Sequence, residues 1–144
     1  MLTVRVVAVG TLKEKFFVSA VDEYVKRLGK YCKFEIIQVK ESGPKKEAEE
    51  IRAKLRGYVI LCDVMGELVS SEGLAKRFED LSMDTSTITF VIGGSDGVGG
   101  YLDDVADEKT SFGKITLPHQ LFRVVLVEQI YRVFTILKGE KYHK

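Results

Sequence analysis

Along this sequence, apolar, β-branched runs alternate regularly with segments of helical spacing, and few folds accommodate such a pattern. The runs at residues 2–9, 34–39, 58–63 and 86–92 are mostly apolar, which is typical of strands buried on both faces of a sheet. Helix-forming segments separate them. This alternation predicts an α/β fold with a mostly parallel sheet, flanked on both faces by helices and joined by right-handed crossovers.

Three segments between these runs are predicted to be helices. In residues 13–28, apolar side chains recur at three- and four-residue steps, and Gly29 follows as a C-terminal signal. Residues 45–55 are charged and carry a narrow apolar stripe. Residues 70–81 begin with two serines, either of which can cap a helix. Residues 64–66 are predicted to form a turn that ends the third strand.

The last third of the chain predicts a fifth strand at residues 112–117 and a helix at 121–137. This helix is apolar on nearly all sides, so it either fills the core or packs against a second subunit. We favour the second explanation, a homodimer. Glu128 and Arg132 have the spacing of a helical ion pair, which supports the assignment.

Length and composition indicate one domain spanning residues 1–144, because 45% of the 144 residues are hydrophobic. The apolar segment 121–137 contains charged residues that a membrane span would rarely carry. No secretory leader is apparent, so we expect a soluble, cytoplasmic protein without a membrane partner. Cys32 and Cys62 lie outside any paired-cysteine motif and are interpreted as reduced, buried thiols.

The net charge of +1 conceals an asymmetry between the two parts of the chain. Residues 1–60 contain thirteen Lys and Arg against eight Asp and Glu, whereas residues 61–144 contain nine against thirteen. The basic side chains of the first part could contact the phosphates of a nucleic acid. Solvated helix ends explain them equally well.

The glycine-rich segment 93–100 follows the fourth strand directly. Glycines allow backbone N–H groups to approach a ligand closely, but no Gly-Lys-Ser/Thr ending is present and acidic residues follow at 103–108. The segment therefore suits a neutral or cationic ligand better than a phosphate. The alternative interpretation is a tight turn and a helix start capped by Asp96.

Further polar residues are ambiguous when taken singly. Asp63, the last residue of the third predicted strand, is either functional or only a polar end to the strand. His119 alone is interpreted as structural, and Tyr142 to Lys144 alone as a frayed end. The chain has two histidines and no acidic residue at ligand spacing from them, so no metal site is predicted.

Together, these motifs resemble those of the bacterial ribosomal large-subunit pseudouridine N3-methyltransferases, a family of the SPOUT class. The resemblance rests on Val-Ile-Gly-Gly-Ser-Asp-Gly at 91–97, Leu-Pro-His at 117–119, Arg-Val at 123–124, Glu-Gln-Ile-Tyr-Arg at 128–132 and the terminal Tyr-His-Lys. It extends to the opening segment and so covers essentially the whole chain.

The resemblance implies a trefoil knot near the C-terminus and S-adenosylmethionine bound there through backbone groups, without a metal. Small apolar side chains would sandwich the adenosine, and a valine at Gly94 would fill the space beneath it. The implied cofactor-binding residues are Leu61, Gly93, Gly94, Gly113, Lys114, Ile115, Thr116, Leu117 and Pro118.

The implied reaction methylates N3 of a pseudouridine in 23S ribosomal RNA, on the assembled ribosome. The implied catalytic residues are Tyr142, which would stack on or hydrogen-bond the base, His143, which would accept or relay a proton, and Lys144, which would contact phosphate or the anionic imide. In a homodimer, this tail would reach the partner's pocket. The competing hypothesis is a non-catalytic nucleotide- or ribosome-binding module.

Overall fold

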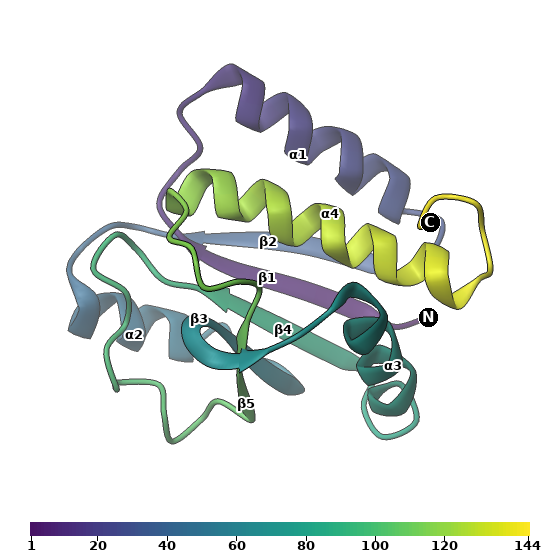
Figure 1. Ribbon diagram of the computed structural model, residues 1–144. Helices are drawn as coiled ribbons and strands as arrows, with labels where there is room; N and C mark the ends of the chain where they lie inside the picture. Colours follow the sequence, from purple (N-terminus) through teal and green to yellow (C-terminus); the bar gives the residue numbers. More distant parts are fainter.

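A computed structural model describes the whole chain, Met1–Lys144, as a five-stranded parallel sheet with four helices (Figure 1). The strand order is β2-β1-β4-β3-β5, and every neighbouring pair is parallel, which confirms the predicted architecture. In chain order the elements are β1 (Thr3–Val9), α1 (Lys15–Leu28), β2 (Lys33–Val39), α2 (Pro44–Arg52), β3 (Tyr58–Leu68), α3 (Ser71–Leu81), β4 (Thr87–Ile92), β5 (Glu108–Ser111) and α4 (His119–Leu137).

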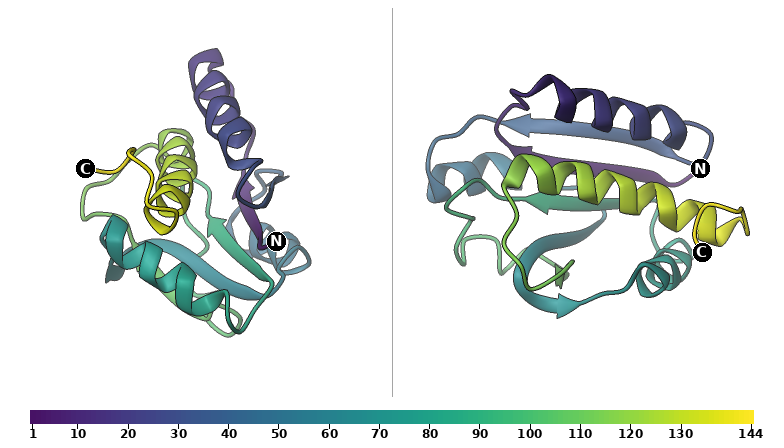
Figure 2. Two further views of the ribbon diagram at one scale, coloured as in Figure 1. Left: turned by 90° about the vertical axis from the view of Figure 1, so that its right-hand side faces the viewer. Right: turned by 45° about the horizontal axis from the view of Figure 1, so that its top comes forward.

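Two separate cores cover the two faces of the sheet. Val4 and Val6 of β1 pack with α1, α3 and α4, whereas Val7 and Val9 pack with α2 and with the segment after β4. Successive side chains of a strand point to opposite faces, so a strand covered on both sides must be apolar throughout. On the first face, α4 lies between α1 and α3 (Figure 2).

Most predicted elements match the observed ones to within three residues at each end. The Ser70 side chain caps α3, where its oxygen accepts a hydrogen bond from the backbone N–H of Gly73 at 2.9 Å. Glu128 and Arg132 form the predicted ion pair along α4, with 2.8 Å between Oε2 and Nη2. Local signals in the sequence were sufficient for these features.

The predicted turn at residues 64–66 is wrong, because β3 continues through it. The strand pairs with β4 up to Leu61 and with β5 up to Cys62, and after a bulge it pairs with β5 again at Glu67 and Leu68. At Gly66 a Cβ atom would lie 2.6 Å from the carbonyl carbon of Lys109, so the glycine permits a close approach of two strands. The glycine that suggested a turn is instead required by the pairing of β3 with β5.

The predicted strand at residues 112–117 is also wrong. The fifth strand is the polar segment before it, and its position is set by pairing with β3 and by a 2.7 Å hydrogen bond from Tyr58 Oη to Glu108 Oε2. Residues 112–117 form a loop toward α4, where the rings of Phe112 and Phe122 meet at 5.5 Å. The apolar residues of this loop are not buried, and Ile115 is exposed, so their apolar character does not indicate a strand inside the sheet.

The helix α4 buries one face rather than its whole circumference. Leu126, Ile130 and Val133 are fully buried in the core, whereas Leu121 and Val125 remain half-buried on the outer side. The apolar character of α4 therefore serves the core on one side and leaves an apolar strip on the other. No helix of this fold has the length and apolar content needed to cross a membrane.

Candidate active site

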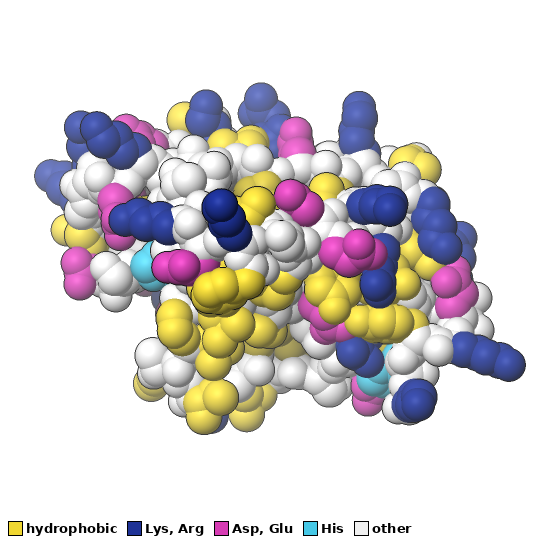
Figure 3. All heavy atoms as spheres, turned by 90° about the horizontal axis from the view of Figure 1, so that it is seen from above, with side chains coloured by type: hydrophobic (Ala, Val, Ile, Leu, Met, Phe, Trp, Pro, Cys, Tyr) yellow, Lys and Arg dark blue, Asp and Glu magenta, His cyan; other side chains and the backbone are white.

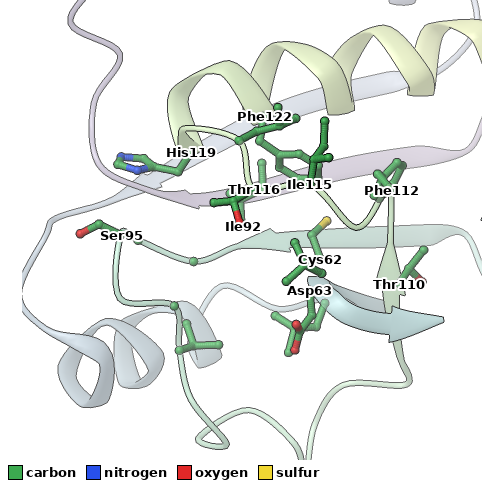
Figure 4. A pocket seen from close by; sticks show the side chains of 18 of the residues that line it. Cys62, Asp63, Ile92, Ser95, Thr110, Phe112, Ile115, Thr116, His119 and Phe122 are labelled. Atoms are coloured by element: carbon green, nitrogen blue, oxygen red, sulfur yellow. The ribbon is translucent and has the colours of Figure 1, made fainter. Parts of the chain in front are cut away.

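A pocket of about 410 Å³ opens where β4 ends and β3 separates from it (Figure 4). Parallel α/β sheets bind ligands outside the carboxyl ends of their strands, and this volume is typical of small-molecule sites. The lining residues are Leu61, Cys62, Asp63, Val64, Ile92, Gly93, Gly94, Ser95, Gly97, Val98, Gly99, Thr110, Phe112, Gly113, Ile115, Thr116, Leu117, His119 and Phe122.

One wall of the pocket is the glycine-rich loop after β4. A Cβ atom at Gly93 would lie 3.2 Å from the Cα atom of Gly97, and the N–H of Gly97 donates to the carbonyl of Gly94 at 2.9 Å. Gly97 and Gly99 have φ values of 69° and 54°, in the left-handed region that favours glycine. The loop is a tight turn, as one of the two interpretations proposed, but no helix begins in it.

Gly94 is seated against the rest of the fold rather than facing open space. A Cβ atom there would lie 3.1 Å from Val9 Cγ1 and 3.2 Å from Glu47 Oε1. The buried Glu47 carboxylate accepts hydrogen bonds from the backbone N–H groups of Ser42 and Gly43 at 2.8 and 3.0 Å. A valine at 94 would therefore press on Val9 and Glu47 first, which corrects the expectation that it would simply fill the pocket.

The opposite wall is the loop that follows β5. Gly113 has a φ of 152°, and its N–H and carbonyl both contact the Ser111 hydroxyl, at 3.3 and 2.9 Å. Ile115 is 73% exposed although it lines the pocket, and the buried Leu61 of β3 lines the pocket as well. Apolar side chains and main-chain groups thus form most of this wall.

The pocket carries almost no charge. No lysine or arginine lines it, and its ionisable groups are Asp63, His119 and the Cys62 thiol. Burial, together with the neighbouring Asp63, raises the pKa of the Cys62 thiol, which therefore remains protonated. The Asp63 carboxylate accepts a hydrogen bond from the N–H of Met65 at 2.9 Å. This composition suits a neutral or cationic ligand, as the loop sequence predicted.

Seven of the nine predicted cofactor-binding residues line the pocket, and two do not. Lys114 and Pro118 contribute nothing to the lining. Pro118 precedes α4, where its carbonyl accepts a hydrogen bond from the N–H of Phe122 at 2.9 Å. The seven residues in the lining are Leu61, Gly93, Gly94, Gly113, Ile115, Thr116 and Leu117.

Sequence reasoning missed several lining residues. His119, interpreted as structural, lies at the pocket with Phe122, which is three residues further along α4. Because the helix was predicted to begin at Leu121, the shared face of these two residues was not recognised. Asp63, which the sequence left undecided, also lines the pocket.

A buried arginine holds the first turns of α4 in place. Arg123 is 1% exposed, and its Nη2 donates to the carbonyls of Val9 and Gly10 at 3.2 and 3.1 Å, while Nη1 donates to Gln38 Oε1 at 2.8 Å. No carboxylate pairs with it, its Nε has no partner, and burial lowers its pKa. The pocket end of α4, with His119, is thereby fixed to the ends of β1 and β2.

The C-terminal tail packs on the other end of α4. Tyr142 Oη donates to Glu128 Oε2 at 2.7 Å, its ring meets that of Tyr131 at 4.7 Å, and the Arg132 guanidinium lies 4.8 Å from its centroid. Burial and then the bond to Glu128 raise the pKa of the Tyr142 phenol. The tail is therefore ordered by specific contacts, unlike a frayed end, and Tyr142 stays a neutral donor.

The three predicted catalytic residues do not reach the pocket of their own chain. His143 contacts Arg132 and Glu72, Lys144 is exposed, and none of the three residues lines the pocket. Phe122 at the pocket and Arg132 at the tail are ten residues apart on α4, which corresponds to about 15 Å. The C-terminal tail lies beside the end of α4 that is far from His119 and Phe122 at the pocket, and Figure 1 shows the C-terminus at that end of the helix.

Known proteins match this chain over nearly its whole length. The family described as predicted SPOUT methyltransferase matches residues 2–143. Proteins named ribosomal RNA large subunit methyltransferase H from Latilactobacillus sakei and Lysinibacillus sphaericus are 45% and 46% identical to it over 159 aligned residues, which cover 99% of this chain and 100% of theirs.

Among solved structures, the SpoU methyltransferase AviRb from Streptomyces viridochromogenes, in complex with AdoMet, has a TM-score of 0.51 and 11% identity. The alignment covers 95% of this chain and 58% of that one, and it supports the fold alone. The family match and the full-length relatives confirm the resemblance that the motifs indicated. The chain belongs to the SPOUT methyltransferase family.

Proposed function

We propose that this protein transfers the methyl group of S-adenosylmethionine to N3 of a pseudouridine in 23S ribosomal RNA. The observation that carries the proposal is an almost uncharged pocket between the glycine-rich loop and residues 112–117, in a chain whose full-length relatives are named ribosomal RNA large subunit methyltransferases. A substrate on the ribosome places the activity in the cytoplasm, and the assembled ribosome is the proposed target.

The residues of the pocket fit S-adenosylmethionine. Main-chain donors and acceptors near Gly93 and Gly113 can read the edge of an adenine, and Leu61, Ile115 and Leu117 can cover its faces. The Asp63 carboxylate and the absence of lysine and arginine favour a cation in this space. When bound, the cofactor supplies an electrophilic methyl group on its sulfonium. We also propose that the segments that enclose this pocket form the trefoil knot that the family resemblance implies.

The separation of tail and pocket supports a homodimer in which each tail serves the partner's pocket. Hydrophobic side chains gather between the two histidines on the surface that carries α4 (Figure 3). Near the pocket, Met65, Leu68 and Ile115 are 83%, 56% and 73% exposed. A second copy would cover such a surface and would bring a foreign Tyr142 and His143 to each pocket.

The decisive experiment is transfer of labelled methyl from S-adenosylmethionine to bacterial ribosomes that lack this modification, followed by nuclease mapping of the labelled nucleotide. We expect label on N3 of one large-subunit pseudouridine. Free 23S RNA and isolated subunits serve as comparison substrates for the assembled ribosome. A folded, dimeric protein that binds these ribosomes without transferring label would instead be the non-catalytic binding module.

A further inference from the structure

Both ring nitrogens of His143 are engaged on its own chain. Nδ1 lies 3.1 Å from Nη1 of Arg132, and Nε2 lies 2.8 Å from Oε1 of Glu72. A histidine that accepts a proton from a substrate needs one nitrogen with a free lone pair. The arrangement therefore bears directly on the chemical role of this residue in the proposed reaction.

The identity of the two partners fixes which nitrogen carries the proton. An arginine guanidinium has donors only, so the Nδ1 atom that faces Arg132 must be the acceptor and carry no proton. The Glu72 carboxylate is an acceptor, so Nε2 must carry the proton and donate it. The contacts thus select the neutral imidazole with its proton on Nε2, and the only lone pair of the ring is covered by a cation.

The two contacts differ in how firmly they are held. Arg132 is bound along α4 by Glu128, whose Oε2 accepts from Nη2 at 2.8 Å and from Nε at 3.2 Å, and both side chains are largely covered. Glu72, by contrast, has a side chain that is 67% exposed. The contact of Nδ1 with Arg132 is therefore the more firmly held. The contact of Nε2–H with Glu72 is the one that a hydrogen-bond acceptor on the substrate can replace.

We propose that His143 meets the substrate as a hydrogen-bond donor through Nε2–H and stabilises the deprotonated imide, and that Arg132 is the positioning residue that keeps it in this form. The inference rests on the proposed function, in which the tail serves methyl transfer. The Glu72 carboxylate oxygen occupies the place that an anionic imide oxygen takes when the substrate is bound.

The base in this step is hydroxide from the solvent rather than His143, and the product of the proton transfer is water. The N3–H proton of the imide leaves to hydroxide from the solvent, and the resulting charge is shared by N3 and the two flanking carbonyl oxygens. One of these oxygens accepts the hydrogen bond from Nε2–H. N3 then bonds the methyl carbon while the carbon–sulfur bond breaks, and its electron pair remains on sulfur.

The first test reads the tautomer of His143 by nitrogen NMR of the imidazole in the free protein. The chain has two histidines, so the His143→Gln variant assigns the signals by their loss. We expect the Nε2–H form at neutral pH in the wild type and in Arg132→Lys, and a measurable rise of the Nδ1–H form in Arg132→Met, where Nδ1 no longer faces a donor. Glu72→Ala should keep it, with Glu79→Ala on α3 as the matched control. A dominant Nδ1–H form in the wild type would overturn the inference.

The second test separates a donor from a base by turnover. A glutamine amide can donate a hydrogen bond but cannot accept a proton at neutral pH, so His143→Gln should retain methyl transfer within about tenfold of wild type, because a hydrogen bond to a charged group survives. His143→Leu should lose roughly 10- to 150-fold, the loss expected for such a bond. Cofactor affinity, measured by calorimetry, should not change in either variant.

The results distinguish this inference from the proposed function. If His143→Gln is as slow as His143→Leu while the wild type methylates ribosomes, His143 is a base and the inference is wrong although the function stands. If the wild type transfers no methyl, the proposed function fails, and the donor role of His143 fails with it.

Discussion

The two ends of α4 differ in the chemical character of the groups around them. At its start, His119 and Phe122 border a pocket built from glycine backbone and apolar side chains, without a lysine or arginine. At its end, Glu128 and Arg132 form an ion pair with each other and hold the tail through hydrogen bonds to Tyr142 and His143. The first end can recognise a ligand by shape and main-chain contacts, whereas the second can act on developing charge. Binding and turnover should therefore respond to different substitutions.

The sharpest test of this division is removal of residues 142–144. Because the tail does not line the pocket, cofactor affinity and dimerisation should be unchanged, while turnover should fall by about 10²- to 10⁴-fold, the range for loss of acid–base or electrostatic groups. Methyl incorporation and calorimetry measure the two quantities. Lys141→Ala, at an exposed neighbouring position, is the control. Full activity of the truncated protein would show that the tail is not needed for turnover.

Substitution of Arg123 tests whether the charged side chain at the pocket end of α4 stabilises the fold. In Arg123→Met, the carbonyls of Val9 and Gly10 lose their buried donor, so the free energy of unfolding should fall by about 1–3 kcal/mol. Denaturant unfolding measures it. The matched change at Arg52, which is exposed and paired with Asp104, should remain within about 0.5 kcal/mol. Equal stability of the Arg123 variant would mean that desolvation of its guanidinium cancels its hydrogen bonds.

Ile115→Ala should weaken cofactor binding without altering the fold. The side chain is 73% exposed in the free protein and lines the pocket, so its apolar area is buried only when a ligand covers it. The loss should be about 1–2 kcal/mol, or roughly 5- to 30-fold in Kd, with an unchanged melting temperature. Met83→Ala, which truncates another exposed apolar side chain outside the pocket, is the control. Unaltered affinity would remove Ile115 from the proposed adenosine site.

The smallest effect concerns Glu108 in the strand beside the pocket. Burial alone would raise the pKa of Glu108, but hydrogen bonds from Tyr58, Arg77 and Thr110 outweigh it, and the pKa lies below its ordinary value of 4.5. A depressed carboxyl pKa stabilises the fold above the unfolded value, and this contribution is lost as pH falls through the folded value. The free energy of unfolding should therefore fall less steeply below pH 4.5 in Glu108→Gln than in wild type. The same substitution at exposed Glu49 is the control, and identical acid profiles for wild type and Glu108→Gln would contradict the assignment.

The sequence was sufficient to predict the strands with continuous apolar runs, the helices with regular spacing and the glycine-rich loop. These features follow from burial and backbone preferences that act over a few residues, as the Ser70 cap and the Glu128–Arg132 pair illustrate. The family could also be identified from the sequence, because its motifs are short segments that occur in a fixed order along the chain. Seven of the nine residues that these motifs predicted to bind the cofactor line one pocket.

Other features depend on contacts between residues far apart in the chain, and these could be seen only in the folded protein. The pairing of Glu108–Ser111 with β3 made a strand of a polar segment and left the apolar residues 112–117 as a loop. The contact between Glu72 and His143, like the burial of Arg123 against β1, has no signature in either local segment. Such contacts form because packing brings distant groups together, and their energies depend on partners that no local pattern specifies.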